Sequence, residues 1–86
     1  MFLKGVEEVN KDKLEKIFNK FKELWEKYDD FLDFTNEMND YLFEEDVKNY
    51  HWEADYWMRP ILIIENKFVI QFNPETDELE LIIKAP

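Results

Sequence analysis

The sequence predicts an α+β domain in which two amphipathic helices pack on one face of an antiparallel three- to four-stranded meander, in the order ααββββ. Three observations support this prediction. Apolar residues recur with helical spacing up to about residue 45, they alternate with polar residues from Tyr50 onward, and turn-forming residues divide the segments that follow. The 86 residues correspond to a single domain, and a content of 45% hydrophobic residues is sufficient for a dense core.

Asn10 is suited to cap the first predicted helix, because its short side chain accepts a free backbone N–H. Apolar residues follow on one stripe, which covers roughly 120° of the helix surface. These residues are Leu14, Ile17, Phe18, Phe21, Leu24, Trp25 and Tyr28. Five of the lysines in this segment fall outside the stripe, so we expect a helix that packs one side on a core.

The helical spacing continues and predicts a second helix over about residues 30–45. Its apolar positions are Phe31, Phe34, Met38, Tyr41 and Leu42. No Gly or Pro separates the two helices, so a turn and a kink are both compatible with the sequence. Asp29, Asp30 and Asp33 supply N-cap and first-turn carboxylates, which favours a new helix. These three aspartates lack the Gly and the terminal Glu of a calcium-binding loop, so we expect no metal there.

Alternation of apolar and polar residues begins at Tyr50 and predicts a strand that Pro60 ends. The residues between the later segments, 65–67 and 73–77, are typical of hairpin turns. The predicted strands are residues 50–59, 61–64, 68–72 and 79–83, with residues 2–6 as a further candidate edge strand.

The last two strands predict one wholly apolar sheet face, which the helices cover. It consists of Phe68, Ile70, Phe72, Leu79, Leu81 and Ile83. The other face combines two residues of 61–64 with Val69, Gln71, Glu80, Ile82 and Lys84. Two interpretations of this mixed face stay open, a homodimer surface and a tolerated scatter of apolar groups.

Catalytic chemistry has few candidate residues. The chain has no Cys and no Ser, one Gly and one His, which excludes disulfides, thiolate zinc sites, ordinary nucleophiles and glycine-rich phosphate loops. His51, Glu53 and Asp55 would share one face of the predicted strand, an arrangement that suits a divalent ion in a metal-dependent hydrolase. Half-solvated strands place polar residues outward in any case, so we expect no enzyme, no metal and no cofactor.

The acidic charge is concentrated in the middle of the chain. The formal net charge is −10, and residues 29–58 alone carry ten acidic residues against one lysine. Affinity for nucleic acid and for anionic membranes depends on Lys and Arg, so direct binding to either is disfavoured and a basic protein is the expected partner. No apolar run has the length of a signal peptide or a membrane span, and we expect a cytoplasmic location.

Four carboxylates lie within about 40° of one line along the second predicted helix, away from its apolar residues. They are Asp33, Glu37, Asp40 and Glu44, which we call the acidic row. The acidic row is about 16 Å long at 1.5 Å per residue. Like charges at this spacing repel, and no lysine on the helix relieves them. Solvation of an ordinary surface is one explanation, but solubility does not require the charges to be segregated.

The second explanation is that the acidic row imitates a phosphate backbone. This predicts a non-catalytic inhibitor that occludes the basic surface of a nuclease or another nucleic-acid-binding enzyme. A phage anti-defence protein directed at CRISPR or restriction enzymes, an immunity protein and an antitoxin all fit this description. The alternative is a homodimeric adaptor whose acidic face is merely solvated. The predicted partner-binding residues are Asp29, Asp30, Asp33, Glu37, Asp40, Glu44, Glu45, Asp46, Tyr50, Glu53, Asp55 and Trp57.

Overall fold

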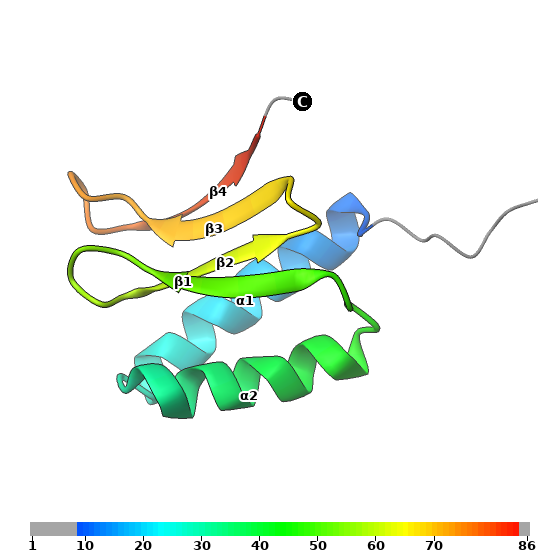
Figure 1. Cartoon of the computed structure of the whole chain (residues 1–86), viewed down its shortest axis with the longest axis horizontal. Helices are drawn as coiled ribbons and strands as arrows, with labels where there is room; N and C mark the ends of the chain where they lie inside the picture. The colour runs from blue at the N-terminus through cyan, green and yellow to red at the C-terminus, as the bar shows by residue number, and fades with distance from the viewer. Residues whose placement is uncertain (1–8, 85–86) are drawn as a thin grey trace, which may run out of the picture.

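The computed structural model describes residues 9–84, which form two helices followed by a four-stranded sheet. The elements are α1 (Lys11–Lys27), α2 (Phe31–Glu44), β1 (Tyr50–Ala54), β2 (Pro60–Ile64), β3 (Phe68–Phe72) and β4 (Leu79–Ile83). The strands are antiparallel in the order β1-β2-β3-β4, and both helices lie on one side of the sheet (Figure 1). The predicted ααββββ fold is confirmed, while the candidate strand at residues 2–6 lies outside the described residues.

Two side-chain caps explain where the helices begin. The Oδ1 atom of Asn10 accepts the N–H of Lys13 at 2.8 Å, and the Oδ2 atom of Asp30 accepts the N–H of Asp33 at 3.1 Å. Between the helices, Tyr28 and Asp30 have extended backbones, with ψ angles of 102° and 131°. The junction is therefore a break between two helices and not a kink.

The turns of the meander follow from local chemistry. Glu65 and Asn66 have φ angles of 56° and 53°, and the N–H of Lys67 donates to the carbonyl of Ile64 at 3.0 Å. These features define a type I′ turn, whose twist matches that of antiparallel strands. In the β3–β4 loop, the Oδ1 atom of Asn73 accepts backbone N–H groups, including that of Glu75 at 2.8 Å. Both predicted hairpins are confirmed.

The prediction for the first strand was wrong at its end. β1 stops at Ala54, and Pro60 begins β2 instead of ending β1. The carboxylate of Asp55 accepts the N–H groups of Trp57 and Arg59 at 2.9 and 2.8 Å, which folds residues 55–59 into a hairpin loop. Proline is tolerated as the first residue of a strand, opposite Ala54 in this register.

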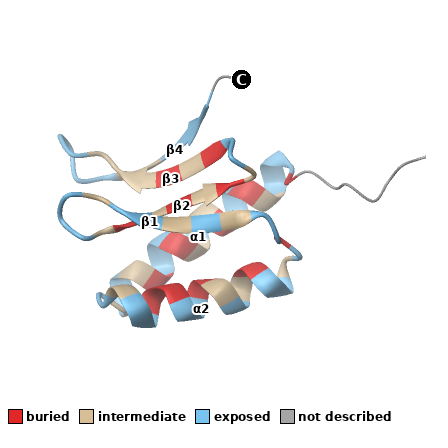
Figure 2. Ribbon diagram, in the orientation of Figure 1, coloured by how far each residue is buried: buried red, intermediate tan, exposed pale blue. Residues whose placement is uncertain are grey.

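The core lies between the helices and the first three strands, where aromatic rings meet edge to face. The ring of Phe34 lies 4.8 Å from that of Phe21 and 5.2 Å from that of Trp25, centroid to centroid. Figure 2 shows buried segments on both helices and on β2 and β3, whereas β4 is largely exposed. The predicted apolar face is thus confirmed in its composition, but the helices leave its β4 side uncovered: Leu81 is 37% and Ile83 62% exposed.

Candidate functional site

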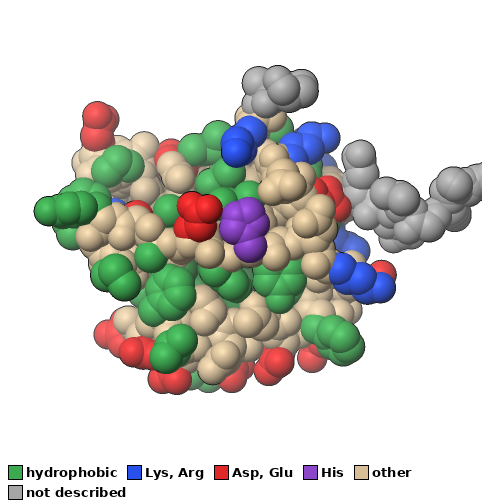
Figure 3. Space-filling view, in the orientation of Figure 1, with side chains coloured by type: hydrophobic (Ala, Val, Ile, Leu, Met, Phe, Trp, Pro, Cys, Tyr) green, Lys and Arg blue, Asp and Glu red, His purple; other side chains and the backbone are tan. Residues whose placement is uncertain are grey.

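All four carboxylates of the acidic row are exposed on α2, on the side opposite its buried residues. Those buried residues are Phe34, Thr35, Met38 and Leu42. Within residues 9–84, no ion pair or side-chain hydrogen bond engages the acidic row. In Figure 3, acidic side chains line the lower edge of the molecule, over α2. The arrangement expected from the helical wheel is therefore present, and the carboxylates of the acidic row are accessible on the surface.

Three lysines of α1 and of the α2–β1 connection form ion pairs with carboxylates outside the acidic row. Lys16 pairs with Glu45 at 3.3 Å, just after α2, and Lys20 pairs with Glu23 on its own helix at 3.5 Å. Lys48 pairs with Asp46 at 3.4 Å. Two of the predicted partner-binding residues, Glu45 and Asp46, thus already have cationic neighbours.

The helix dipole has opposite effects on carboxylates at the two ends of α2. Asp29 and Asp30 are exposed at the N-terminal end, where the helix dipole stabilises carboxylates. Glu44 is in the last turn, which contains no basic residue, and there its charge opposes the dipole. A carboxylate at this position therefore opposes the helix dipole and costs stability.

The pKa values of two tyrosines are affected by the negative charges around α2. Burial raises the pKa of Tyr41, and the charges of Glu45, Glu23 and Glu44 raise it further, in that order. Burial also raises the pKa of Tyr50, with a smaller contribution from the charge of Asp40.

Two large apolar side chains of α2 are exposed beside the acidic row. Leu32 is 69% and Phe43 83% exposed. Sequence reasoning missed both residues, although their helical-wheel angles place them outside both the apolar stripe and the acidic row. A surface that combines charge with exposed apolar groups can supply contact area as well as electrostatic attraction.

The predicted aromatic contributor Tyr50 instead joins the helix to the sheet. Its hydroxyl donates to the Oδ1 atom of Asn39 at 3.0 Å, and the Nε1 atom of Trp52 donates to the same oxygen at 2.9 Å. Tyr50 is only partly exposed and faces α2. Its role in this structure is to hold α2 against β1.

The structure does not bring the remaining predicted residues to the acidic row. Glu53 lies on the sheet face that the helices leave open, next to His51, with 3.5 Å between Oε2 and Nε2. Asp55 belongs to the β1–β2 loop and binds Arg59. The predicted trio of His51, Glu53 and Asp55 is therefore not assembled, and residues 9–84 contain no group of three His, Asp or Glu suited to a metal ion.

The β1–β2 loop is a separate polar structure that ends in exposed aromatic rings. Arg59 donates through Nε to Asp55 at 2.9 Å and through Nη1 to Asp77 at 3.1 Å, and its guanidinium stacks 5.1 Å from the ring of Trp57. Burial alone would raise the pKa of the Asp55 carboxyl. The hydrogen bonds from Arg59 and Trp57 and the charge of Arg59 outweigh burial and hold the pKa of Asp55 below its ordinary value. Trp57 and Tyr56 are exposed at the tip of this loop.

Comparison with protein-family models, with curated proteins and with solved structures gives no match. Neither helix within residues 9–84 has the length and apolar character needed to cross a bilayer. The candidate function consequently rests on the geometry and charge of this chain alone.

Proposed function

We propose that the protein is a non-catalytic inhibitor whose α2 face occupies the basic nucleic-acid-binding surface of a nuclease or a similar enzyme. The observation that carries this proposal is the exposed acidic row, whose charges have no cationic partner within residues 9–84. Phage anti-defence proteins, immunity proteins and antitoxins are the classes of protein that would act in this way. The partner is a protein, and the action requires neither a cofactor nor direct contact with nucleic acid.

The charge density of the acidic row explains why apolar contacts must contribute. Duplex DNA carries one charge per about 1.7 Å of helix axis, so about 16 Å of DNA presents nine or ten charges where the acidic row presents four. Asp29 and Asp30 extend the negative surface at one end of α2. Leu32 and Phe43 are available to bury apolar area beside it.

Affinity capture from a bacterial lysate tests the proposal when two charge-matched variants are compared with the wild type. The row variant carries Asp33→Asn, Glu37→Gln, Asp40→Asn and Glu44→Gln. The matched control carries Asp12→Asn, Glu15→Gln, Glu26→Gln and Glu75→Gln, four exposed positions outside α2 with no side-chain partner within residues 9–84. Both variants remove four negative charges from a formal total of −10.

We expect the wild type and the matched control to capture the same basic nucleic-acid-binding protein, which excess duplex DNA should displace. The row variant should lose this capture, and wild-type capture should fall steeply with increasing salt because the contact is electrostatic. Equal loss in both variants would show that only net charge matters. Equal capture by all three proteins would refute a role for the acidic row.

A further inference from the structure

The outer edge of β4 is unpaired within residues 9–84, because β4 is the last strand of the sheet. Hydrogen bonding to β3 fixes which backbone groups point outward. The backbone N–H of Lys84 donates to the carbonyl of Lys67, and the carbonyl of Glu78 accepts the backbone N–H of Asn73. The backbone N–H and C=O groups of residues 78 and 84 therefore point toward the β3 side. In an antiparallel ladder this direction alternates, which leaves the N–H and C=O groups of Leu79, Leu81 and Ile83 pointing away from the sheet.

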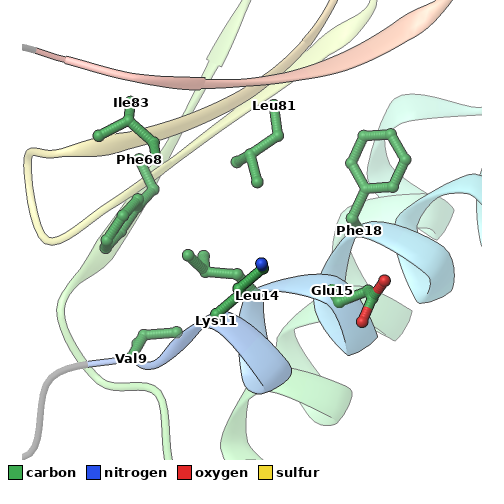
Figure 4. A pocket seen from close by; sticks show the side chains of 8 residues that line it. All are labelled: Val9, Lys11, Leu14, Glu15, Phe18, Phe68, Leu81 and Ile83. Atoms are coloured by element: carbon green, nitrogen blue, oxygen red, sulfur yellow. The ribbon is translucent and has the colours of Figure 1, made fainter.

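The side chains of these three residues lie on the helix-facing side of β4, where an apolar groove opens beside α1. The groove encloses about 530 Å³ and lies between the first half of α1 and strands β3 and β4 (Figure 4). Its apolar walls come from Val9, Leu14, Phe18, Phe68, Leu81 and Ile83. Lys11 and Glu15 also line it. Unpaired edges of natural sheets usually carry proline, bulges or charged side chains. β4 has no proline and no bulge, and its one charged residue, Glu80, binds Gln71 and Asn73 at 3.2 and 3.1 Å on the β3 side.

We propose that β4 pairs with β4 of a second copy of the chain, antiparallel and around a two-fold axis at Leu81. This proposal goes beyond the inhibitor function and does not rest on it. With the axis at Leu81, all five residues of β4 are paired, and Leu79 lies opposite Ile83 of the second copy. The outward backbone groups then form hydrogen-bonded pairs, and each helix-side pair is apolar on both sides.

Charge complementarity supports a second copy of the chain as the partner of the β4 edge. The same register places Glu78 of one copy opposite Lys84 of the other, and the two-fold axis repeats this pair. The acidic rows lie on α2, which packs on β1 at the other edge of the sheet, so they stay far from the axis. At a Debye length of about 10 Å in 0.1 M salt, their mutual repulsion is largely screened.

Single cysteines test the register, because the natural chain has no Cys. Residues that face each other in a hydrogen-bonded pair have Cα atoms about 5.5 Å apart, which a disulfide can span. We expect Leu81→Cys to cross-link to itself under mild oxidation and Leu79→Cys to remain uncross-linked alone. A mixture of Leu79→Cys and Ile83→Cys should cross-link. A dimer whose Leu81→Cys variant does not cross-link would overturn the proposed interface.

Charge reversal at two surface positions gives a test that does not alter the groove. Glu78→Lys alone and Lys84→Glu alone each place like charges opposite each other in a homodimer and should weaken it. Mixing the two variants restores both opposite-charge pairs, so we expect heterodimers in the mixture. Failure of the mixture to associate more strongly than either variant alone would contradict the register.

Sedimentation equilibrium of the full chain measures the association itself. We expect a mass of twice 10.7 kDa at high protein concentration. A chain that stays monomeric at every concentration overturns the proposal. A variant that lacks residues 1–8 tests whether this segment, and not a second copy, pairs with the edge of β4. Dimerisation that is unchanged by the removal supports the second copy. A dimer that forms only after this removal would show that the N-terminal segment occupies the edge.

Discussion

Replacement of Glu44 by lysine should stabilise the fold and at the same time weaken the interaction of the acidic row. Glu44 is exposed in the last turn of α2, four residues after Asp40, and that turn has no basic residue. The change removes a like-charge pair and creates an opposite-charge pair, each worth about 0.2–0.5 kcal/mol. A cation at the C-terminal end of the helix adds about 0.3–1 kcal/mol through the dipole. The expected gain is therefore roughly 1 kcal/mol or somewhat more, which raises Tm by about 4–8 °C in a domain of this size.

Thermal unfolding followed by circular dichroism measures this gain. Glu44→Gln removes the repulsion without adding a cation, so its Tm should lie between those of the wild type and Glu44→Lys. Salt at 1 M shortens the Debye length to about 3 Å and should shrink both gains. The reasoning fails if Glu44→Lys is no more stable than the wild type at low salt, or if the gain is unchanged at 1 M salt.

Two further predictions concern contacts that hold the elements together. Asn39→Ala removes the oxygen that accepts the hydroxyl and indole donors of β1, so urea unfolding should show a loss of about 1–3 kcal/mol. The exposed Asn36→Ala on the same helix is the control and should change little. The pKa of Asp55 is lower in the folded protein than its ordinary value of 3.8, so its ionised carboxylate stabilises the fold fully at pH values above 3.8. This stabilisation is lost as the pH falls through the lower pKa of the folded state. Asp55→Asn should therefore be less stable than the wild type by about 1–2 kcal/mol at neutral pH, and the difference should vanish in strong acid; a difference that persists unchanged in acid would count against the ion pair with Arg59.

Features that depend on neighbouring residues could be predicted from the sequence. The caps at Asn10 and Asp30 act within three residues, and the turn after Ile64 is closed by one short hydrogen bond. The acidic row was predictable for the same reason, because its members share one helix and their relative angles follow from helical geometry.

Features that depend on how elements meet could not be predicted. Alternation from Tyr50 onward resembles a long strand, yet the carboxylate of Asp55 binds the backbone ahead of it and turns the chain. The face of β1 that carries Glu53 is set by pairing with β2, which places it away from α2. The exposure of β4 depends on how far α1 reaches across the sheet, and no local pattern encodes that distance.

Inhibition kinetics of the captured enzyme test the central claim most directly. The captured enzyme is assayed at increasing concentrations of its nucleic-acid substrate, with the wild-type protein and with the row variant. Mimicry of a phosphate backbone predicts competitive inhibition, in which the apparent KM rises, kcat is unchanged, and the row variant has no effect. If the enzyme binds nucleic acid and this protein simultaneously, or if kcat falls at unchanged KM, the account is contradicted.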